Sequence, residues 1–309
     1  VKEDQITHHL LMVRPAHFGY NHETAENNAF QSENPDLTPE QVQAKAVREF
    51  DEFVSRLRQA GVNVHVADDT ASPLKPDAVF PNNWVTFHQD GTVATYPMHA
   101  PTRRHERREE ILDSLANRFE VHQRIRFEDA ESEQLFLEGT GSLILDRPNR
   151  IAYACLSPRT DERVLDRFCE RMGYKQMAFT ALDPKGQPIY HTNVMMALGL
   201  DFVVICLEAV PDQREREQLL SHFKATHKAV IEITMQQMLA FAGNMLQVRN
   251  QAGEPYVVMS EQAYESLRPE QVRQLEAHTK VLHSPLYTIE QHGGGSARCM
   301  MAEIFLKEK

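Results

Sequence analysis

The residue in this sequence most suited to covalent chemistry is Cys299. It follows a run of three glycines at 293–295 and comes directly after Arg298. Glycine lets backbone amides approach a ligand closely, and a cationic neighbour favours the nucleophilic thiolate. A lone cysteine can equally be a small core residue at the start of a strand. The other three cysteines, in apolar stretches that suggest strands or a helix, are interpreted as core residues: Cys155, Cys169 and Cys206.

Two further residues could complete a covalent site with this cysteine. His191 stands at the start of an apolar run, and strand alternation would place Asn193 on the same side of the chain. Glu138 lies within an otherwise apolar stretch, where a buried carboxylate needs a partner. We therefore predict a nucleophile, a proton carrier and an orienting carboxylate. The alternative for His191 is a structural, hydrogen-bonded histidine.

The candidate residues recur at a nearly constant spacing. The separations between consecutive members of the set are 55, 53, 53 and 55 residues, the set being Asn83, Glu138, His191, Asn244 and Cys299. Such a period is typical of a repeat architecture that sets the same position of each unit around a common axis. Asn83 and Asn244 could also be turn or capping residues. If the repeat closes into a circle, all five meet in one central pocket.

The segments around these residues predict the repeating unit. In four of them a polar cluster leads into a strand, then a Gly, Asn or Asp turn, then a second strand, which indicates a hairpin. Between the hairpins lie five stretches that suggest helices, at 38–60, 103–119, 161–172, 213–223 and 260–278, and further strands such as the one beginning at Val62. The unit is two strands, a helix and usually another strand, repeated about five times.

Composition narrows the class of protein. The 309 residues are 41% hydrophobic and 25% charged, which allows a sizeable core, and the formal net charge of -11 disfavours nucleic acid. The arginine-rich run 103–108 is interleaved with glutamates, and we interpret it as the solvated start of a helix. The sequence shows no metal-ligand spacing among its 15 histidines and four cysteines. No apolar run approaches the ~20 residues that span a membrane, and no signal-peptide pattern is visible, so we expect a cytoplasmic protein.

On these residues the sequence resembles the guanidino-group modifying superfamily, which includes arginine deiminases, dimethylarginine dimethylaminohydrolases, arginine dihydrolases and amidinotransferases. The resemblance covers most of the chain and is nearest to the citrulline-hydrolase or arginine-dihydrolase branch. It rests on VFPNNW at residue 79, the Glu138 segment, the His-x-Asn at 191–193, GNML at 243 and the terminal GGGSARCM. The resemblance implies a single domain over residues 1–309, a five-bladed, pseudo-symmetric α/β propeller of ββαβ-type modules around a central pocket.

The resemblance also implies the role of each residue. Cys299 would attack a guanidino or ureido carbon and form a thiouronium-type intermediate, while His191 would protonate the departing amine and then activate water. Glu138 would hold the histidine or contact substrate nitrogens. The residues implied or considered for substrate binding are Asn83, Asn193, Asn244, Arg298 and Arg14. The two arginines are weaker candidates, for binding a substrate carboxylate, and either could equally form a structural ion pair. This chemistry needs no cofactor.

Departures from the family pattern bear on the substrate. Deiminases usually carry aspartates where Asn83 and Asn193 stand, and the EGTGS after Phe136-Leu137 replaces a common E-G-G-D. Fewer carboxylates in a desolvated pocket weaken the binding of a cation relative to a neutral group. A neutral ureido group, as in citrulline, therefore becomes a candidate beside arginine, which arginine dihydrolases accept with an asparagine at the position of Asn83.

Three functions remain open on the sequence. The first is a hydrolase that releases ammonia or an amine from an arginine-like or citrulline-like amino acid. The second is an amidinotransferase, in which an amine acceptor replaces water, and the third is a catalytically silent propeller with a binding or regulatory role. We expect a small amino acid as the partner, no nucleic acid and no membrane, with a homo-oligomer possible.

Overall fold

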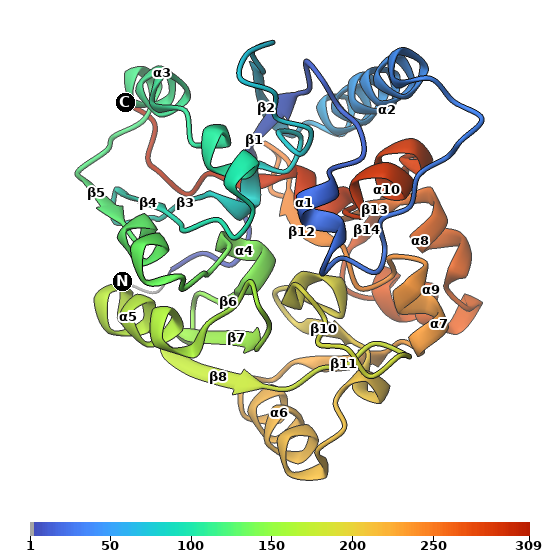
Figure 1. Cartoon of the computed structure of the whole chain (residues 1–309). Coiled ribbons are helices and arrows are strands. Elements are labelled where there is room, and N and C mark those ends of the chain that lie inside the picture. Colours follow the sequence, from blue (N-terminus) through green and yellow to red (C-terminus); the bar gives the residue numbers. More distant parts are fainter. Residues whose placement is uncertain (1–2) are drawn as a thin grey trace.

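The computed structural model describes residues 3–309, and over that range the strands form five three-stranded sheets set around a central axis (Figure 1). In four of the sheets the innermost strand pairs antiparallel with the middle strand, which pairs parallel with the outer one. The fifth follows the same pattern with strands from both ends of the chain. The predicted five-bladed α/β propeller is confirmed.

Four blades are continuous in the chain, and each runs through inner strand, middle strand, helix and outer strand. The first contains β3 (Val85–Phe87), β4 (Thr92–Thr95), α3 (Glu109–Arg118) and β5 (Gln123–Arg126). The second contains β6 (Ile144–Asp146), β7 (Ile151–Cys155), α5 (Glu162–Met172) and β8 (Lys175–Phe179). The third contains β9 (Met196–Leu198), β10 (Phe202–Ile205), α6 (Gln213–Ala225) and β11 (Ala229–Glu232). The fourth contains β12 (Leu246–Arg249), β13 (Pro255–Ser260), α8 (Glu261–Ser266), α9 (Pro269–Glu276) and β14 (Lys280–Ser284).

The fifth blade closes the circle by joining the two ends of the chain. Its inner strand is β15 (Ala302–Glu303), and its other elements are β1 (His9–Arg14), α2 (Pro39–Gln59) and β2 (Asn63–Asp68). Leu10 of β1 pairs with Glu303 of β15, and β1 pairs in parallel with β2. The circular closure predicted from the repeat is therefore present, and it brings the C-terminal Cys299 segment beside the N-terminal blade.

Helix α2 forms where the sequence predicts it. Thr38 caps its N-terminus in a capping box with Gln41, and Pro39 occupies the first turn, where a missing N–H costs nothing. A stripe of apolar side chains is buried against the fifth blade: Val42, Ala46, Phe50, Phe53, Val54 and Leu57. Gly61, at a φ of +88°, then reverses the chain toward β2.

Two of the helix predictions are wrong in detail. The stretch 260–278 is two helices, because Pro269 starts α9 and disfavours helical geometry at the residue before it. The stretch 103–119 begins as a 3-10 helix over Pro101–Glu106, and α3 starts only at Glu109. The interpretation of the arginine-rich run as solvated is also wrong for its first member, because Arg103 is 2% exposed.

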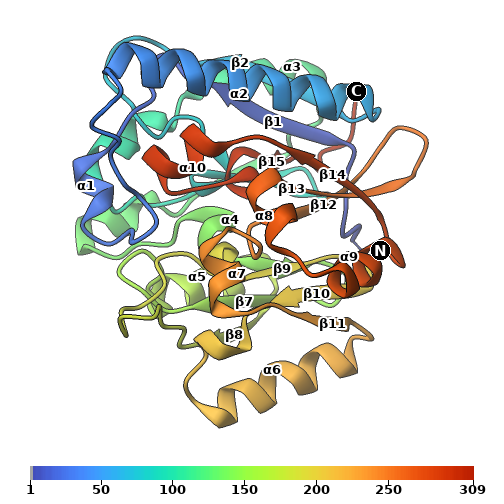
Figure 2. The ribbon, with the colours of Figure 1, turned by 90° about the vertical axis from the view of Figure 1, so that its right-hand side faces the viewer.

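Four short helices lie between blades: α1 (His22–Ala25), α4 (Gly139–Ser142), α7 (Met235–Leu239) and α10 (Tyr287–Gly293). In Figure 1, α1 lies in front of the centre of the propeller. Figure 2 shows that α1 and the N-terminus lie on opposite sides of the molecule, so they mark the two ends of the propeller axis, called its mouths below. The mouth under α1 is where the inner strands begin.

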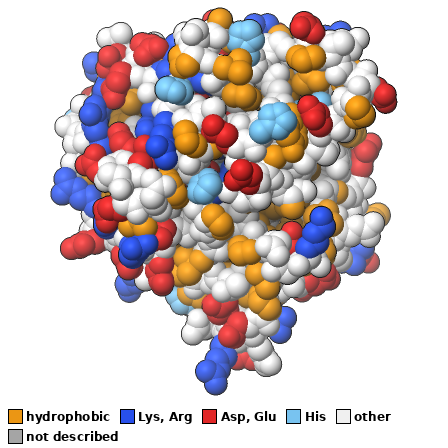
Figure 3. Space-filling view, in the orientation of Figure 1, with side chains coloured by type: hydrophobic (Ala, Val, Ile, Leu, Met, Phe, Trp, Pro, Cys, Tyr) orange, Lys and Arg blue, Asp and Glu red, His pale blue; other side chains and the backbone are white. Residues whose placement is uncertain are grey.

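The face seen in Figure 3 carries acidic and basic side chains intermixed. Ion pairs between exposed side chains include Arg124 with Glu109 at 2.5 Å and with Asp113 at 2.7 Å. None of the helices within residues 3–309 combines the length and apolar character needed to cross a bilayer.

A pair of histidines, one buried and one half-buried, makes the stability of the fold depend on pH. His9 Nδ1 lies 3.1 Å from His65 Nε2, and both rings contact Phe119. Burial is the largest cause that lowers the pKa of each histidine to about 4. Their unfolded-state pKa is near 6.5, so the folded state disfavours protonation. The stabilisation is complete above about pH 6.5 and is lost as the pH falls from there toward 4.

We therefore expect the free energy of unfolding, measured by urea titration, to fall by on the order of 1–3 kcal/mol between about pH 7.5 and pH 5. A His9→Gln/His65→Gln variant should show a shallower slope, because it removes two of the groups that titrate. A variant with the slope of the wild-type protein would contradict the assignment.

Candidate active site

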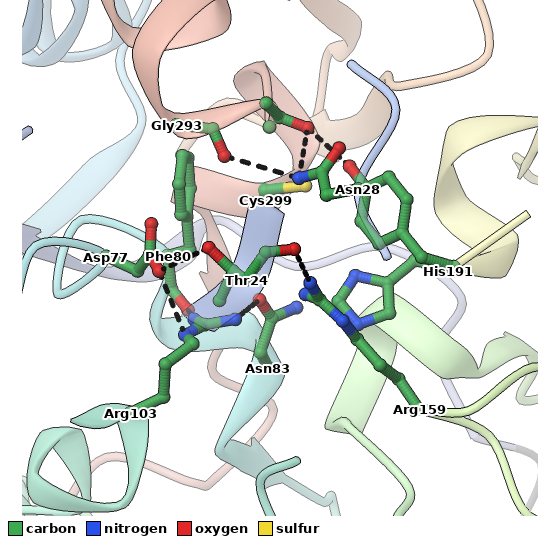
Figure 4. Close-up of a pocket in the computed structure, with 13 residues that line it drawn as sticks. Thr24, Asn28, Asp77, Phe80, Asn83, Arg103, Arg159, His191, Gly293 and Cys299 are labelled. Carbon is green, nitrogen blue, oxygen red and sulfur yellow. Dashed lines mark hydrogen bonds and ion pairs between the residues drawn. The ribbon is translucent and has the colours of Figure 1, made fainter. Parts of the chain in front are cut away.

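A small cavity lies beneath α1 at the mouth where the inner strands begin. Figure 4 shows Cys299, His191, Asn83 and two arginines facing it. The lining residues come from four of the blades and from the segment around α1, and they are Thr24, Asn28, Asp77, Phe80, Asn83, Arg103, Arg159, Tyr190, His191, Gly293, Gly294, Gly295 and Cys299. The cavity thus unites residues spread over most of the sequence.

Cys299 lies in a 3-10 turn, Ala297–Met300, and is 2% exposed. Its Sγ accepts hydrogen bonds from Asn193 Nδ2 at 3.4 Å and Asn244 Nδ2 at 3.3 Å. The orientation of Asn244 is fixed, because its Oδ1 accepts from the backbone N–H of Arg298 at 3.0 Å. Two amide donors therefore point at the sulfur, where they would stabilise negative charge.

His191 and Glu138 form a buried hydrogen-bonded pair. His191 Nε2 lies 2.7 Å from Glu138 Oε2, and Glu138 Oε1 accepts from the backbone N–H of His99 at 2.9 Å. Burial lowers the pKa of His191 to about 4, although Glu138 acts in the opposite direction. At neutral pH the imidazole is thus neutral with its proton on Nε2, which leaves Nδ1 able to accept a proton.

Two buried arginines keep Glu138 ionised. Burial alone would raise the pKa of Glu138, but Arg159, His191 and Arg103 together hold it well below its usual range. Arg159 Nη1 and Arg103 Nη1 lie 3.7 Å and 3.8 Å from its Oε2. Arg103 also forms a bidentate pair with Glu106, at 2.9 Å and 3.0 Å. The charges near the cavity are therefore matched to one another.

Asn83 lies in the 3-10 turn Pro81–Asn83, and both ends of its amide are engaged. Its Oδ1 accepts from Arg103 Nη1 at 2.9 Å, and its Nδ2 donates to Asn82 Oδ1 at 3.0 Å. A Cβ on Gly141 would lie 2.5 Å from Asn83 Nδ2 and 2.7 Å from His191 Nδ1. The absence of a side chain at Gly141 therefore allows Asn83 and His191, from two different blades, to lie close together.

Two buried oxygen atoms near the cavity have no hydrogen-bond partner among the described residues: Asn193 Oδ1 and Asp77 Oδ1. The other oxygen of Asp77 accepts from Asn21 Nδ2 at 2.7 Å. A buried acceptor without a partner is costly, and a ligand with N–H groups would satisfy both. Asn193 also donates to Cys299 through its Nδ2, and Asp77 lines the cavity.

The segment around α1 covers the cavity and is tied to several blades. Arg159 donates to Thr24 O at 2.8 Å and to Asn27 Oδ1 at 2.7 Å. Asn28 Nδ2 donates to Gly294 O at 3.4 Å on the glycine run that precedes Cys299. These contacts exclude bulk water, which strengthens electrostatic interactions inside the cavity.

The structure brings together most of the residues predicted from the sequence. Cys299, His191 and Asn83 line the cavity. Glu138 hydrogen-bonds to His191, and Asn193 and Asn244 donate to Cys299. Two residues lie elsewhere. Arg298 pairs with Glu303 at 2.7 Å outside this cavity, and Arg14 pairs with Asp51 at 2.8 Å at the surface. The structure therefore favours structural ion pairs for both.

Sequence reasoning missed several lining residues, among them Asp77, Arg103, Arg159 and Tyr190. Arg103 stands in a charged run that looks solvated, and Arg159 stands in a Ser-Pro-Arg-Thr turn. Nothing in the local pattern separates these two arginines from surface residues, and only the packing of the blades identifies them. Asp77 and Tyr190 adjoin the VFPNNW and His-x-Asn segments, and this closeness was the available signal. Within residues 3–309 no group of three or more His, Cys, Asp or Glu side chains is placed to hold a metal ion.

The fold and this site define the class of protein: a guanidino-group modifying enzyme of the superfamily that includes amidinotransferases, dimethylarginine dimethylaminohydrolases and arginine dihydrolases. The family model described as N,N dimethylarginine dimethylhydrolase, eukaryotic, matches residues 14–306, and the chain belongs to this family of hydrolases of guanidino carbon–nitrogen bonds. A comparison with curated protein sequences gave no match.

Solved structures share the fold at low sequence identity. The N-terminal domain of ArgZ, a cyanobacterial arginine dihydrolase bound to product, is 18% identical with a TM-score of 0.74, over 97% of this chain and 98% of that one. AgrE with L-arginine is 17% identical with a TM-score of 0.74, over 96% of this chain and 40% of that one. A dimethylarginine dimethylaminohydrolase adduct with S-methyl-L-thiocitrulline is 15% identical with a TM-score of 0.64, over 96% and 99%.

The site predicts a selective thiol. Burial is the main reason why the other three thiols have a raised pKa, about 12 for Cys155 and Cys169 and about 11 for Cys206. Brief iodoacetamide treatment near pH 8 should therefore alkylate Cys299 at least about tenfold faster than the others, read by peptide mass spectrometry.

An Asn244→Ala variant removes one donor to the sulfur and should slow the alkylation of Cys299 only. Equal labelling of all four cysteines, or labelling of Cys299 unaffected by this substitution, would contradict the proposed environment of the thiol.

Proposed function

We propose that the chain hydrolyses the ureido group of a citrulline-like amino acid, with Cys299 as the covalent nucleophile. The observation that carries this proposal is the neutrality of the groups around the thiol. Its two hydrogen-bond donors are the amides of Asn193 and Asn244, and a third amide, Asn83, lines the same cavity.

A guanidinium cation in this position would need a carboxylate of its own. Glu106 is held in a bidentate pair with Arg103, and both oxygens of Glu138 are engaged by His191 and by the backbone of His99. The third carboxylate at the cavity, Asp77, has one unpartnered oxygen, which we assign to the α-ammonium end of the substrate and not to its head group. Leaving a buried cation without an anion costs several kcal/mol, on the order of 3–5. A ureido group carries no charge and avoids this cost, while its N–H groups can still donate to Asn193 Oδ1.

The first chemical step follows from the protonation states. His191 Nδ1 accepts the thiol proton of Cys299, and Sγ attacks the ureido carbon. The bond from that carbon to the side-chain nitrogen breaks, and His191 returns the proton to the departing amine. The products of this step are the free amine, ornithine in the case of citrulline, and a carbamoyl group on Sγ.

Water completes the cycle. His191 takes a proton from a water molecule that attacks the carbamoyl carbon, the carbon–sulfur bond breaks, and the thiolate regains a proton. The carbamate released decomposes to ammonia and carbon dioxide. Glu138 holds the imidazole in one tautomer throughout and stabilises the imidazolium that forms between proton transfers.

The amino-acid end of the substrate has polar partners in the cavity wall. Asp77 offers an unpartnered oxygen that can accept from an α-ammonium group, and Arg159 lies above the Tyr190 ring at 5.0 Å with its guanidinium facing the cavity. The guanidinium of Arg159 is suited to the α-carboxylate of an amino acid, and the carboxylate of Asp77 to its α-ammonium group. We assign these two residues to the binding of that end.

Arginine is the second candidate, since ArgZ is described as an arginine dihydrolase and AgrE is solved with L-arginine. Attack on a guanidino carbon would give the thiouronium-type intermediate instead. Amidino transfer would use the same first step, with an amine in place of water.

Product analysis by mass spectrometry, with citrulline and arginine supplied separately, distinguishes these reactions. We expect ornithine and ammonia from citrulline, and no product with Cys299→Ala. Citrulline formed from arginine would instead show deiminase chemistry, and arginine converted to ornithine would show dihydrolase chemistry. Transfer to an added amine would show an amidinotransferase, and no reaction with either substrate would contradict the proposed substrate.

The neutral head-group site can be tested by adding charge. Asn193→Asp places a carboxylate where the amide now faces the thiol. We expect the ratio of kcat/KM for citrulline to that for arginine to fall at least about tenfold, since one buried charge pair is worth more than ~1.4 kcal/mol. Asn193→Ala is the matched control, because it removes the amide without adding charge and should weaken both substrates alike. An unchanged ratio in Asn193→Asp would contradict the electrostatic argument.

A further inference from the structure

A second, small cavity lies on the same axis, at the mouth opposite Cys299. Its walls come from the inner strands β6, β9, β12 and β15, beyond the turns that carry the catalytic groups. The lining residues are Gln5, Thr140, Ile144, Leu145, Arg147, Ala197, Leu198, Met245, Leu246, Arg298 and Glu303. The proposed reaction uses none of them.

Arg147 gives this cavity an uncompensated positive charge. The residue is 2% exposed, and its guanidinium stacks on the Phe305 ring at 4.0 Å. Among residues 3–309, no carboxylate oxygen lies within 4.0 Å of the Arg147 guanidinium, so Arg147 forms no ion pair. The other buried arginines that face the two cavities differ, because Arg103, Arg159 and Arg298 each have a carboxylate partner.

The polar neighbour of Arg147 cannot supply the missing charge. Its Nη1 lies 3.4 Å from His88 Nδ1, and His88 Nε2 lies 2.8 Å from Thr86 Oγ1. Burial lowers the pKa of His88 well below its usual value, so the ring is neutral. Stacking on an aromatic ring offsets only part of the cost of burying a cation.

The remaining polar groups of the cavity are satisfied. Arg298 and Glu303 form a pair at 2.7 Å that is neutral as a unit. Gln5 closes the mouth, because its Oε1 accepts from the backbone N–H of Arg147 at 2.9 Å and its Nε2 donates to Leu145 O at 2.9 Å. The sum of charges in the cavity is therefore one positive charge, carried by Arg147.

We propose that this cavity binds a small monovalent anion, a halide or a short carboxylate, on the guanidinium of Arg147. Arg298 lines the same cavity, and it directly precedes Cys299 in the turn Ala297–Met300. An anion held here stabilises the inner ends of four blades and the base of that turn. The site is separate from the substrate cavity and does not depend on which substrate the enzyme uses.

The test compares thermal unfolding of the whole chain in sodium chloride, sodium acetate and sodium gluconate at equal ionic strength, gluconate being too large for the cavity. We expect a higher Tm in chloride or acetate than in gluconate, saturating with concentration. Arg147→Gln should lose this difference, while Arg167→Gln, which removes an exposed arginine, should keep it. Stabilisation by chloride alone would identify a halide site, and stabilisation by both anions would extend it to carboxylates.

A crystal of the wild-type protein soaked in sodium bromide gives a second readout that does not require the variant to fold. An anomalous peak within hydrogen-bond distance of the Arg147 guanidinium is expected. The absence of a peak there, together with equal Tm values in chloride and gluconate, would overturn the proposal.

Discussion

The arrangement of the site depends on one buried negative charge, that of Glu138. A carboxylate with no exposed surface is stable only if cations and hydrogen-bond donors surround it, and here they are His191, Arg103, Arg159 and a backbone N–H. Each of these partners also faces or supports the substrate cavity. The requirement to satisfy Glu138 thus fixes the tautomer of the histidine and draws two arginines from other parts of the chain into the interior.

The propeller supplies the second constraint. Each inner strand starts at the same mouth, so the residue before or at its start points toward the axis regardless of its distance along the chain. Closure of the fifth blade by β15 and β1 is what places Cys299, near the C-terminus, opposite groups from the first three continuous blades. The site therefore exists only in the closed ring.

The sequence alone was enough to predict the blades and the inner ring of residues, because both follow from the 53 to 55 residue period. It was not enough for Arg103 and Arg159, whose neighbours in sequence are those of ordinary surface segments, and whose burial follows from contacts between blades. The weaker assignments of Arg14 and Arg298 rested on proximity in sequence to a strand or to Cys299. Side-chain direction decides otherwise, since Arg298 turns toward Glu303 and Arg14 toward Asp51.

The measurement that tests the central claim most directly is to quench the enzyme in acid during turnover of citrulline labelled in the ureido carbon and to map the adduct by peptide mass spectrometry. The account predicts one labelled carbamoyl group, on Cys299, that disappears once the substrate is consumed. Turnover of citrulline with no adduct on any cysteine, or with the label on another residue, would contradict covalent catalysis by Cys299.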